Sequence, residues 1–265
     1  MPAADVNGIT VHYEREGDGP RLLFLNGSGA TLASTQLLLT PFRRQFDLLA
    51  HDQRGLGETS IPAGPYTMAD YAADAVCLLD HVGWERCAVV GISFGGMVAQ
   101  ELAATVPDRV SRLALLCTSP GGPDSSSYPL HELAAMEPAE QARIGPQLLD
   151  TRFTPEWLAA HDGDRALAEM MAGRRSIERS PEHSRGASEQ LEARRHHDAR
   201  DRLHRITCPT LVASGRYDGI APPANGTSIA ARIDGAELRL FDGGHAFFAQ
   251  DRAALPAVLD FLAAD

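Results

Sequence analysis

Short apolar runs alternate with segments of helical periodicity along most of the chain. Leu22-Leu23-Phe24-Leu25 is apolar throughout, which is typical of a strand buried on both faces of a sheet. Residues 67–82 begin with a Thr67-x-x-Asp70 capping box and repeat apolar side chains at helical spacing, so they predict a helix. Alternating strands and helices favour a mostly parallel sheet with right-handed crossovers. Further strands are expected at 47–51, 88–90, 112–117, 209–214 and 236–241.

Two stretches depart from this alternation. Asn7-Gly8 lies between short alternating pieces and predicts an antiparallel hairpin at the edge of the sheet. From 120 to 205 helix-forming segments are punctuated by prolines, and no run in this stretch is strand-like. We therefore expect an α/β core of about eight strands, formed by residues 1–119 and 206–265, with a helical cap inserted over 120–205.

The composition narrows the functional classes. The chain has 265 residues, 44% of them hydrophobic and 22% charged, as in ordinary globular proteins. A net charge of −11 disfavours a nucleic-acid or anionic-membrane partner. No apolar run approaches the ~18 residues of a membrane span, and the first residues lack the basic and apolar regions of a secretory signal, so we expect a cytoplasmic protein. The four cysteines show no C-x-x-C spacing and predict buried reduced thiols.

The segment Gly91-Ile92-Ser93-Phe94-Gly95 is the strongest chemical signal in the chain. It follows a predicted strand and precedes a helix-forming stretch, which is the context that the G-x-S-x-G pattern requires. A serine at so tight a turn is expected in a strained conformation, with the flanking glycines allowing strand and helix to approach. Its hydroxyl then lies beside the positive end of the helix dipole. An ordinary glycine-rich turn with a capping serine is the alternative interpretation, and residues elsewhere in the chain must distinguish the two.

A serine hydroxyl becomes a good nucleophile when a base takes its proton and a carboxylate orients that base. Asp218 follows the predicted strand 209–214, and His245 follows the strand 236–241. Both therefore lie at the carboxyl ends of strands, where parallel sheets bind their ligands. Asp124, which follows the strand 112–117, is the alternative acid.

Other histidines and charged residues have structural interpretations. His51 ends a predicted strand just before Asp52 and Arg54, which we expect to form an ion pair or to brace their loop. His196-His197 could suggest a metal, but no third ligand has suitable spacing, so we expect a solvated face of the cap.

Together these motifs resemble the α/β-hydrolase fold family, and the resemblance covers nearly the whole chain. It is most specific over 22–29, 52–57, 87–101, 209–222 and 241–248. The order Ser93, Asp218, His245 matches the order of nucleophile, acid and base in that family. The resemblance therefore implies those three catalytic roles.

The resemblance also implies an oxyanion hole built from the backbone N–H groups of Ser28 and Phe94. The His-Gly pair that more often opens the first of these loops is replaced here by Asn26-Gly27. This departure is closer to the pattern of enol-lactonases. Asn26 and Gly27 are accordingly candidate substrate-binding residues.

We therefore expect a serine hydrolase acting on a small carboxylic ester or lactone, with no metal or organic cofactor. An aspartate at position 93 would have indicated dehalogenase or epoxide-hydrolase chemistry. A C–C bond hydrolase, an acyltransferase, a cofactor-free peroxidase or oxygenase, and a ligand receptor that retains the triad remain alternatives. We expect the cap to select the substrate while the triad forms without it.

Overall fold

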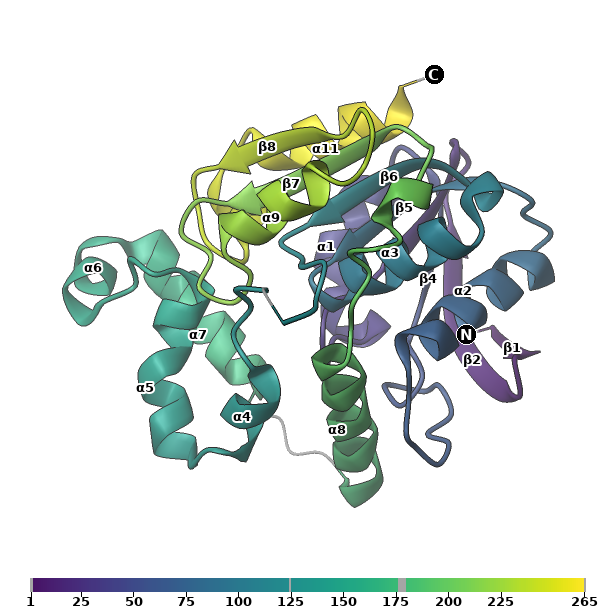
Figure 1. Ribbon diagram of the computed structural model, residues 1–265. Helices are drawn as coiled ribbons and strands as arrows, with labels where there is room; N and C mark the ends of the chain where they lie inside the picture. The colour runs from purple at the N-terminus through teal and green to yellow at the C-terminus, as the bar shows by residue number, and fades with distance from the viewer. Residues whose placement is uncertain (1, 124, 176–179, 265) are drawn as a thin grey trace.

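The computed structural model describes residues 2–123, 125–175 and 180–264. Its eight strands form one sheet in the order β1-β2-β4-β3-β5-β6-β7-β8 (Figure 1). The antiparallel pairs are β1 with β2 and β2 with β4, and all other neighbours are parallel. The predicted mostly parallel sheet and its edge hairpin are therefore confirmed. The strands are β1 (Ala3–Val6), β2 (Ile9–Glu16), β3 (Arg21–Leu25), β4 (Asp47–His51), β5 (Cys87–Ile92), β6 (Val110–Leu116), β7 (Thr210–Gly215) and β8 (Glu237–Phe241).

The register brings the carboxyl ends of the central strands to one edge of the sheet. Gly91 near the end of β5 is paired with Leu25 of β3 on one side and Leu115 of β6 on the other. At the far side, Gly215 at the end of β7 is paired with Phe241 at the end of β8. The loops that follow these strands are consequently neighbours, although they are distant in sequence.

Helices cover both faces of the sheet, as the fully apolar strands require. Leu23 and Val89 point into a core shared with α2, α3 and α9, while Leu22 and Val90 point into a core shared with α1 and α11. Helix α2 begins at the predicted capping box, in which the Thr67 side chain and the Asp70 side chain each accept from the other's backbone N–H. These helices are α1 (Leu32–Arg43), α2 (Met68–His81), α3 (Phe94–Thr105), α9 (Pro223–Ala230) and α11 (Ala254–Ala263), with the short α10 (Phe247–Gln250), η1 (Pro107–Arg109) and η2 (Leu203–Arg205) between them.

Among the described residues, five α-helices lie between β6 and β7, and they form the predicted helical insertion. Figure 1 shows them gathered on one side of the core. They are α4 (Leu130–Ala135), α5 (Pro138–Leu149), α6 (Pro155–Ala160), α7 (Asp162–Arg175) and α8 (Pro181–Arg195). The division of the chain at 120 and 205 stays a prediction. Among the described residues, no helix combines the length and apolar character needed to cross a bilayer.

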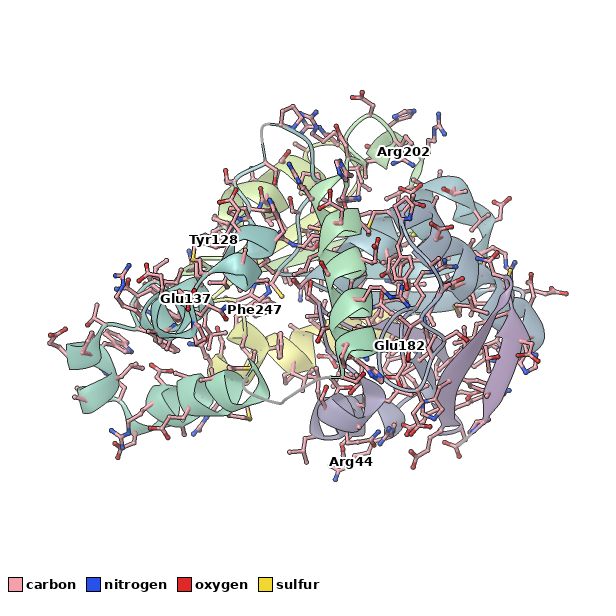
Figure 2. The ribbon with its side chains drawn as sticks, turned by 90° about the horizontal axis from the view of Figure 1, so that it is seen from below. Arg44, Tyr128, Glu137, Glu182, Arg202 and Phe247 are labelled. Carbon is pink, nitrogen blue, oxygen red and sulfur yellow. The ribbon has the colours of Figure 1, made fainter. Side chains whose placement is uncertain are left out.

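Helix α8 crosses the core from the region of Glu182 toward that of Arg202 (Figure 2). Its first turns are held by the loop that follows β4, since His183 Nε2 lies 3.0 Å from the carbonyl oxygen of Gly57. Arg185 donates to the carbonyl oxygens of Ile61 and Pro62 at 2.9 and 2.7 Å. The start of the helix is thus fixed to the core.

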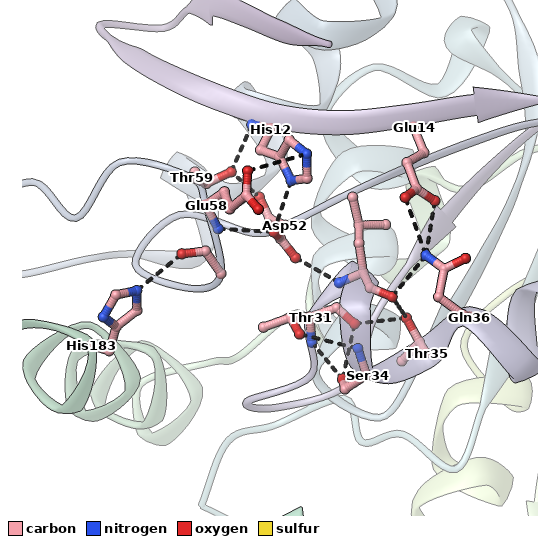
Figure 3. Close-up of polar contacts among 12 residues, drawn as sticks. His12, Glu14, Thr31, Ser34, Thr35, Gln36, Asp52, Glu58, Thr59 and His183 are labelled. Atoms are coloured by element: carbon pink, nitrogen blue, oxygen red, sulfur yellow. Dashed lines mark hydrogen bonds and ion pairs between the residues drawn. The ribbon is translucent and has the colours of Figure 1, made fainter. Parts of the chain in front are cut away.

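The loop after β4 is itself braced by Asp52 (Figure 3). One carboxylate oxygen of Asp52 lies 3.1 Å from His12 Nδ1 and accepts from the Glu58 N–H at 3.0 Å, and the other accepts from the Leu32 N–H at 2.7 Å. Asp52 and Arg54 therefore act as braces, but they bond to partners elsewhere and not to each other. Arg54 donates two hydrogen bonds to Asp74, each 2.7 Å long.

Candidate active site

Ser93 occupies the turn between β5 and α3, with no other residue between the two elements. Its φ of 54° and ψ of −112° lie outside the common regions for a side-chain-bearing residue, which confirms the predicted strain. A side chain on Gly95 would overlap the backbone of Leu25, so only glycine lets α3 approach β3 this closely. The Ser93 N–H donates to the Leu116 carbonyl at 2.8 Å, and Thr118 Oγ1 donates to the Ser93 carbonyl at 2.7 Å. These two bonds hold the strained conformation.

Ser93, His245 and Asp218 form a continuous line of hydrogen bonds. Ser93 Oγ lies 3.0 Å from His245 Nε2, and His245 Nδ1 lies 2.8 Å from one carboxylate oxygen of Asp218. The other carboxylate oxygen accepts from the N–H groups of Ile220 and Ala221, both at 2.8 Å. Because an ionised carboxylate only accepts, Nδ1 carries the proton and Nε2 is free to accept one from the serine. The structure therefore brings together the three residues that the sequence singled out.

The two ends of the line of hydrogen bonds are buried, and the His245 side chain between them is 13% exposed. The exposed fraction of Ser93 is 7% and that of Asp218 is 2%. Low exposure strengthens electrostatic interactions at this site, because little solvent is present to screen them. The arrangement can accept a proton from Ser93 and stabilise the resulting imidazolium through Asp218.

The loop after β3 lies directly against Ser93. A Cβ placed on Gly27 would be 3.6 Å from the Ser93 Cβ, which is ordinary van der Waals contact. Within the described part of the chain, the N–H groups of Ser28 and Phe94 donate no hydrogen bond. Both predicted oxyanion donors are thus free, one in each of the two loops that meet at the serine.

Asn26 is almost completely buried at the start of this loop. Its carbonyl oxygen accepts from Gln53 Nε2 at 2.7 Å, which ties the loop to the one after β4. Its own Nδ2 and the Oγ of Ser28 are buried with no hydrogen-bond partner among the described residues. Unpaired buried polar atoms are costly, so they are suited to contact a bound molecule or ordered water.

No sequence motif indicates the support that the cap lends to the histidine loop. The His245 N–H donates to the carbonyl of Leu149, the last residue of α5, at 2.6 Å. The neighbouring Asp150 accepts from Gln250 Nε2 at 2.9 Å, and Gln250 Oε1 in turn accepts from the Gly244 N–H at 2.8 Å. The end of α5 is therefore part of the framework that positions His245.

The remaining candidates lie outside this site or serve the fold. His51 is buried at the end of β4, and burial lowers its pKa. His196 is exposed and pairs with Glu192, but His197 is buried, so the expectation of a solvated face is wrong for His197. It is buried because the chain turns back after α8 and pairs Asp198 with Gly121.

No group of three or more potential metal ligands occurs among residues 2–123, 125–175 and 180–264. The cysteines are free thiols, of which Cys77 is half-buried and the other three are buried. The alternative acid, Asp124, lies outside the described residues.

Comparisons with known proteins agree with the fold. Residues 20–251 match a family model described as the alpha/beta hydrolase fold. The chain is 27% identical over 242 residues to 3-oxoadipate enol-lactonase 2 of Acinetobacter baylyi, covering 89% of this chain and 86% of that protein. It is 31% identical over 272 residues to a candidate carbamate hydrolase of Variovorax paradoxus, covering 96% and 97%. The enol-lactonase from Burkholderia xenovorans LB400 superposes with a TM-score of 0.82 at 27% identity, covering 99% of this chain and 100% of that one.

Proposed function

The chain belongs to the α/β-hydrolase fold family, and from this premise we propose that it is a serine hydrolase of small carboxylic esters or lactones. The observation that carries the proposal is the hydrogen-bonded line from Ser93 through His245 to Asp218. Likeness to two enol-lactonases supports the ester or lactone class. A small molecule is accordingly the expected partner.

In the first half of the reaction, Ser93 Oγ attacks the substrate carbonyl carbon while its proton passes to His245 Nε2. The C–O bond forms, and the carbonyl electron pair moves to the oxygen. Asp218 stabilises the imidazolium, and the N–H groups of Ile220 and Ala221 hold its carboxylate in place. Collapse of the intermediate expels the alcohol oxygen, which takes the proton from His245 and leaves an acyl group on Ser93.

The developing oxyanion is stabilised by the N–H groups of Phe94 and Ser28. Phe94 is the first residue of α3, so its N–H is one of those that an α-helix leaves unbonded. Fixed donors of this kind stabilise the transition state without reorganising during the reaction. Asn26 and Gly27 line the same loop and contact the substrate beside the oxyanion.

In the second half, water attacks the acyl group and gives its proton to His245. The second intermediate collapses, Ser93 recovers its proton, and the carboxylic acid is released. For a lactone the alcohol and the acid belong to one molecule, so the product is a single hydroxy acid or its keto form. Neither half of this reaction requires a metal or an organic cofactor.

Steady-state turnover of 4-nitrophenyl esters and simple lactones tests the proposal. A hydrolase gives many turnovers and a product that matches hydrolysis, and Ser93→Ala abolishes them. A receptor that retains the triad would give at most one slow turnover. Transfer of the acyl group to added alcohol in preference to water would instead favour the acyltransferase alternative.

A further inference from the structure

Arg194, near the end of α8, is a buried cation for which no described residue supplies a counterion. Its exposed fraction is 7%, and its Nε is buried with no hydrogen-bond partner in the described part of the chain. Burial lowers the pKa of its guanidinium to about 10, so the group is still charged at neutral pH. Burying an unpaired charge is unfavourable, and proteins normally avoid it by supplying a partner.

Other arginines of this protein do have such partners. Arg54 donates to Asp74, Arg152 to Asp150 and Arg202 to Glu101, and each of these carboxylates is buried. The chain carries 35 acidic side chains, so a carboxylate opposite Arg194 would have been easy to place. Among the described residues Arg194 therefore differs from these three arginines, because none of them supplies it with a carboxylate.

Arg194 lies on the side of α8 that faces the loop after β3. Gln190 stands one turn earlier, and residues four apart are neighbours on one helix face. The Gln190 Oε1 accepts from the Gly29 N–H at 2.8 Å, while its Nε2 is buried with no partner among the described residues. Long helical side chains lean toward the helix N-terminus, which directs the Arg194 stem toward Gln190.

On its other side, Arg194 approaches the loop after β6. The chain turns back directly after α8, and the His197 N–H donates to the Arg194 carbonyl at 3.2 Å. His197 in turn packs against Gly121, three residues after Thr118, whose hydroxyl bonds to the Ser93 carbonyl. Arg194 is thus located between the two loops that flank the Ser93 strand.

We propose that Arg194 and Gln190 form an anion subsite that binds a carboxylate of the substrate. The guanidinium offers two parallel N–H donors to the carboxylate, and Gln190 Nε2 supplies a third. The ester or lactone that is hydrolysed therefore carries an ionised carboxylate besides the bond that is broken. This inference rests on the proposed function for its chemistry, but the binding of the carboxylate can be measured without catalysis.

The kinetic test compares matched anionic and neutral esters. Mono-4-nitrophenyl glutarate is compared with 4-nitrophenyl valerate, with the succinate and adipate monoesters covering other chain lengths. For a carboxylate on the alcohol side, 4-acetoxybenzoate is compared with phenyl acetate. We expect kcat/KM to favour the anionic member of at least one pair, and Arg194→Met to reduce that ratio by roughly 10²-fold.

The adjacent Arg195 provides the matched control. It is exposed, and its guanidinium lies 3.5 Å from Glu192. Arg195→Met removes the same charge from the same helix, so it should leave the ratio of anionic to neutral kcat/KM as in the parent. Arg194→Lys should restore part of the ratio that Arg194→Met loses, since the charge returns without the planar pair of donors.

Calorimetry with the Ser93→Ala protein separates this inference from the hydrolase proposal. Monomethyl glutarate should bind at least tenfold more tightly than dimethyl glutarate, and Arg194→Met in the same background should remove the difference. Equal binding of the two esters by the Ser93→Ala protein would overturn the anion subsite. Failure of the parent to turn over any ester would overturn only the hydrolase proposal, because the calorimetric result decides the subsite by itself.

Discussion

The backbone N–H of His245 donates a hydrogen bond to the carbonyl oxygen of Leu149 at 2.6 Å. Leu149 ends α5 of the cap, whereas His245 follows the last strand of the core. Thr151 adds a second tie, since its N–H donates to the Tyr217 carbonyl at 2.8 Å, one residue before Asp218. One short segment of the cap therefore supports the loops that carry both His245 and Asp218.

Replacing Asp150 should lower both the stability of the protein and its catalytic activity. The Asp150 side chain has no exposure and accepts from Arg152 and Gln250. Asp150→Asn keeps the shape but removes the charge opposite a largely buried arginine, so unfolding should become easier by roughly 3 kcal/mol. We also expect kcat to fall, because the His245 loop loses part of its support. Urea denaturation and ester kinetics measure the two effects.

Asp242→Asn is the matched control for Asp150→Asn. Asp242 also pairs with Arg152, at 3.1 Å, but its side chain is mostly exposed. An exposed pair contributes little, so both stability and kcat should stay close to those of the parent. Equal effects of the two substitutions would contradict the role given to Asp150.

Asp218→Asn should lower kcat by several orders of magnitude, with ~10⁴-fold as the guide from a well-studied triad. The amide cannot hold the Nδ1–H tautomer of His245 as a carboxylate does, although Ile220 and Ala221 can still bond to it. Asp124→Asn should have a mild effect, because Asp218 already contacts His245. Exchanged outcomes for these two variants would assign the acid role to Asp124.

Substitutions of Ser28 distinguish the role of its backbone N–H in the oxyanion hole from that of its hydroxyl. The Ser28→Ala substitution removes a hydroxyl that is buried without a partner among the described residues, so kcat should change less than roughly tenfold. Ser28→Pro removes the N–H and should cost at least ~10²-fold in kcat. A crystal structure of the proline variant controls for distortion of the loop. If the alanine variant is as damaged as the proline variant, the hydroxyl itself contacts the substrate.

His197 should make stability depend on pH. Burial lowers the pKa of His197 to about 4, below the ~6.5 of an unfolded histidine. Between these values the unfolded chain binds a proton that the folded chain does not. The His197 contribution is therefore complete above about pH 6.5 and is lost progressively as the pH falls toward 4.

Replacement of His197 by Phe should flatten this dependence. The loss of unfolding free energy between pH 6.5 and pH 4 should be smaller than in the parent, by ~3 kcal/mol at most. His196→Gln, which changes the exposed neighbour, controls for removing a histidine. Parallel pH profiles for the parent and His197→Phe would refute this assignment.

The regular part of the fold could be predicted because burial leaves a periodic record in the sequence. The apolar run at 22–25 and the strand 47–51 correspond closely to β3 and β4, and the pattern at 67–82 corresponds to α2. The sequence also predicts the three residues of the hydrogen-bonded line, because each lies within a few residues of the carboxyl end of a predicted strand. Parallel strands end at one edge of the sheet, so no further information was needed to bring them together.

Contacts between distant segments could not be predicted in this way. The sequence predicts a cap whose removal leaves the triad intact. In the structure, however, the Leu149 carbonyl accepts a hydrogen bond from the His245 N–H, and a backbone hydrogen bond of this kind has no sequence signature. The charged neighbours of His197 predict a solvated surface. Helix α8 ends at Arg195, however, so the helical periodicity does not extend to His197. For Arg194, helical periodicity can indicate that the side chain lies on a buried face of α8. It cannot indicate that no described residue pairs with the guanidinium.

Mass spectrometry of the acylated protein tests the central claim most directly. The parent is treated with a phosphonate inhibitor and, separately, quenched during turnover of a 4-nitrophenyl ester. We predict one phosphonyl group per chain and a transient acyl group, both on the peptide that contains Ser93, and neither in Ser93→Ala. A label on another residue, or a Ser93→Ala protein that turns over esters at a rate near that of the parent, would contradict the account.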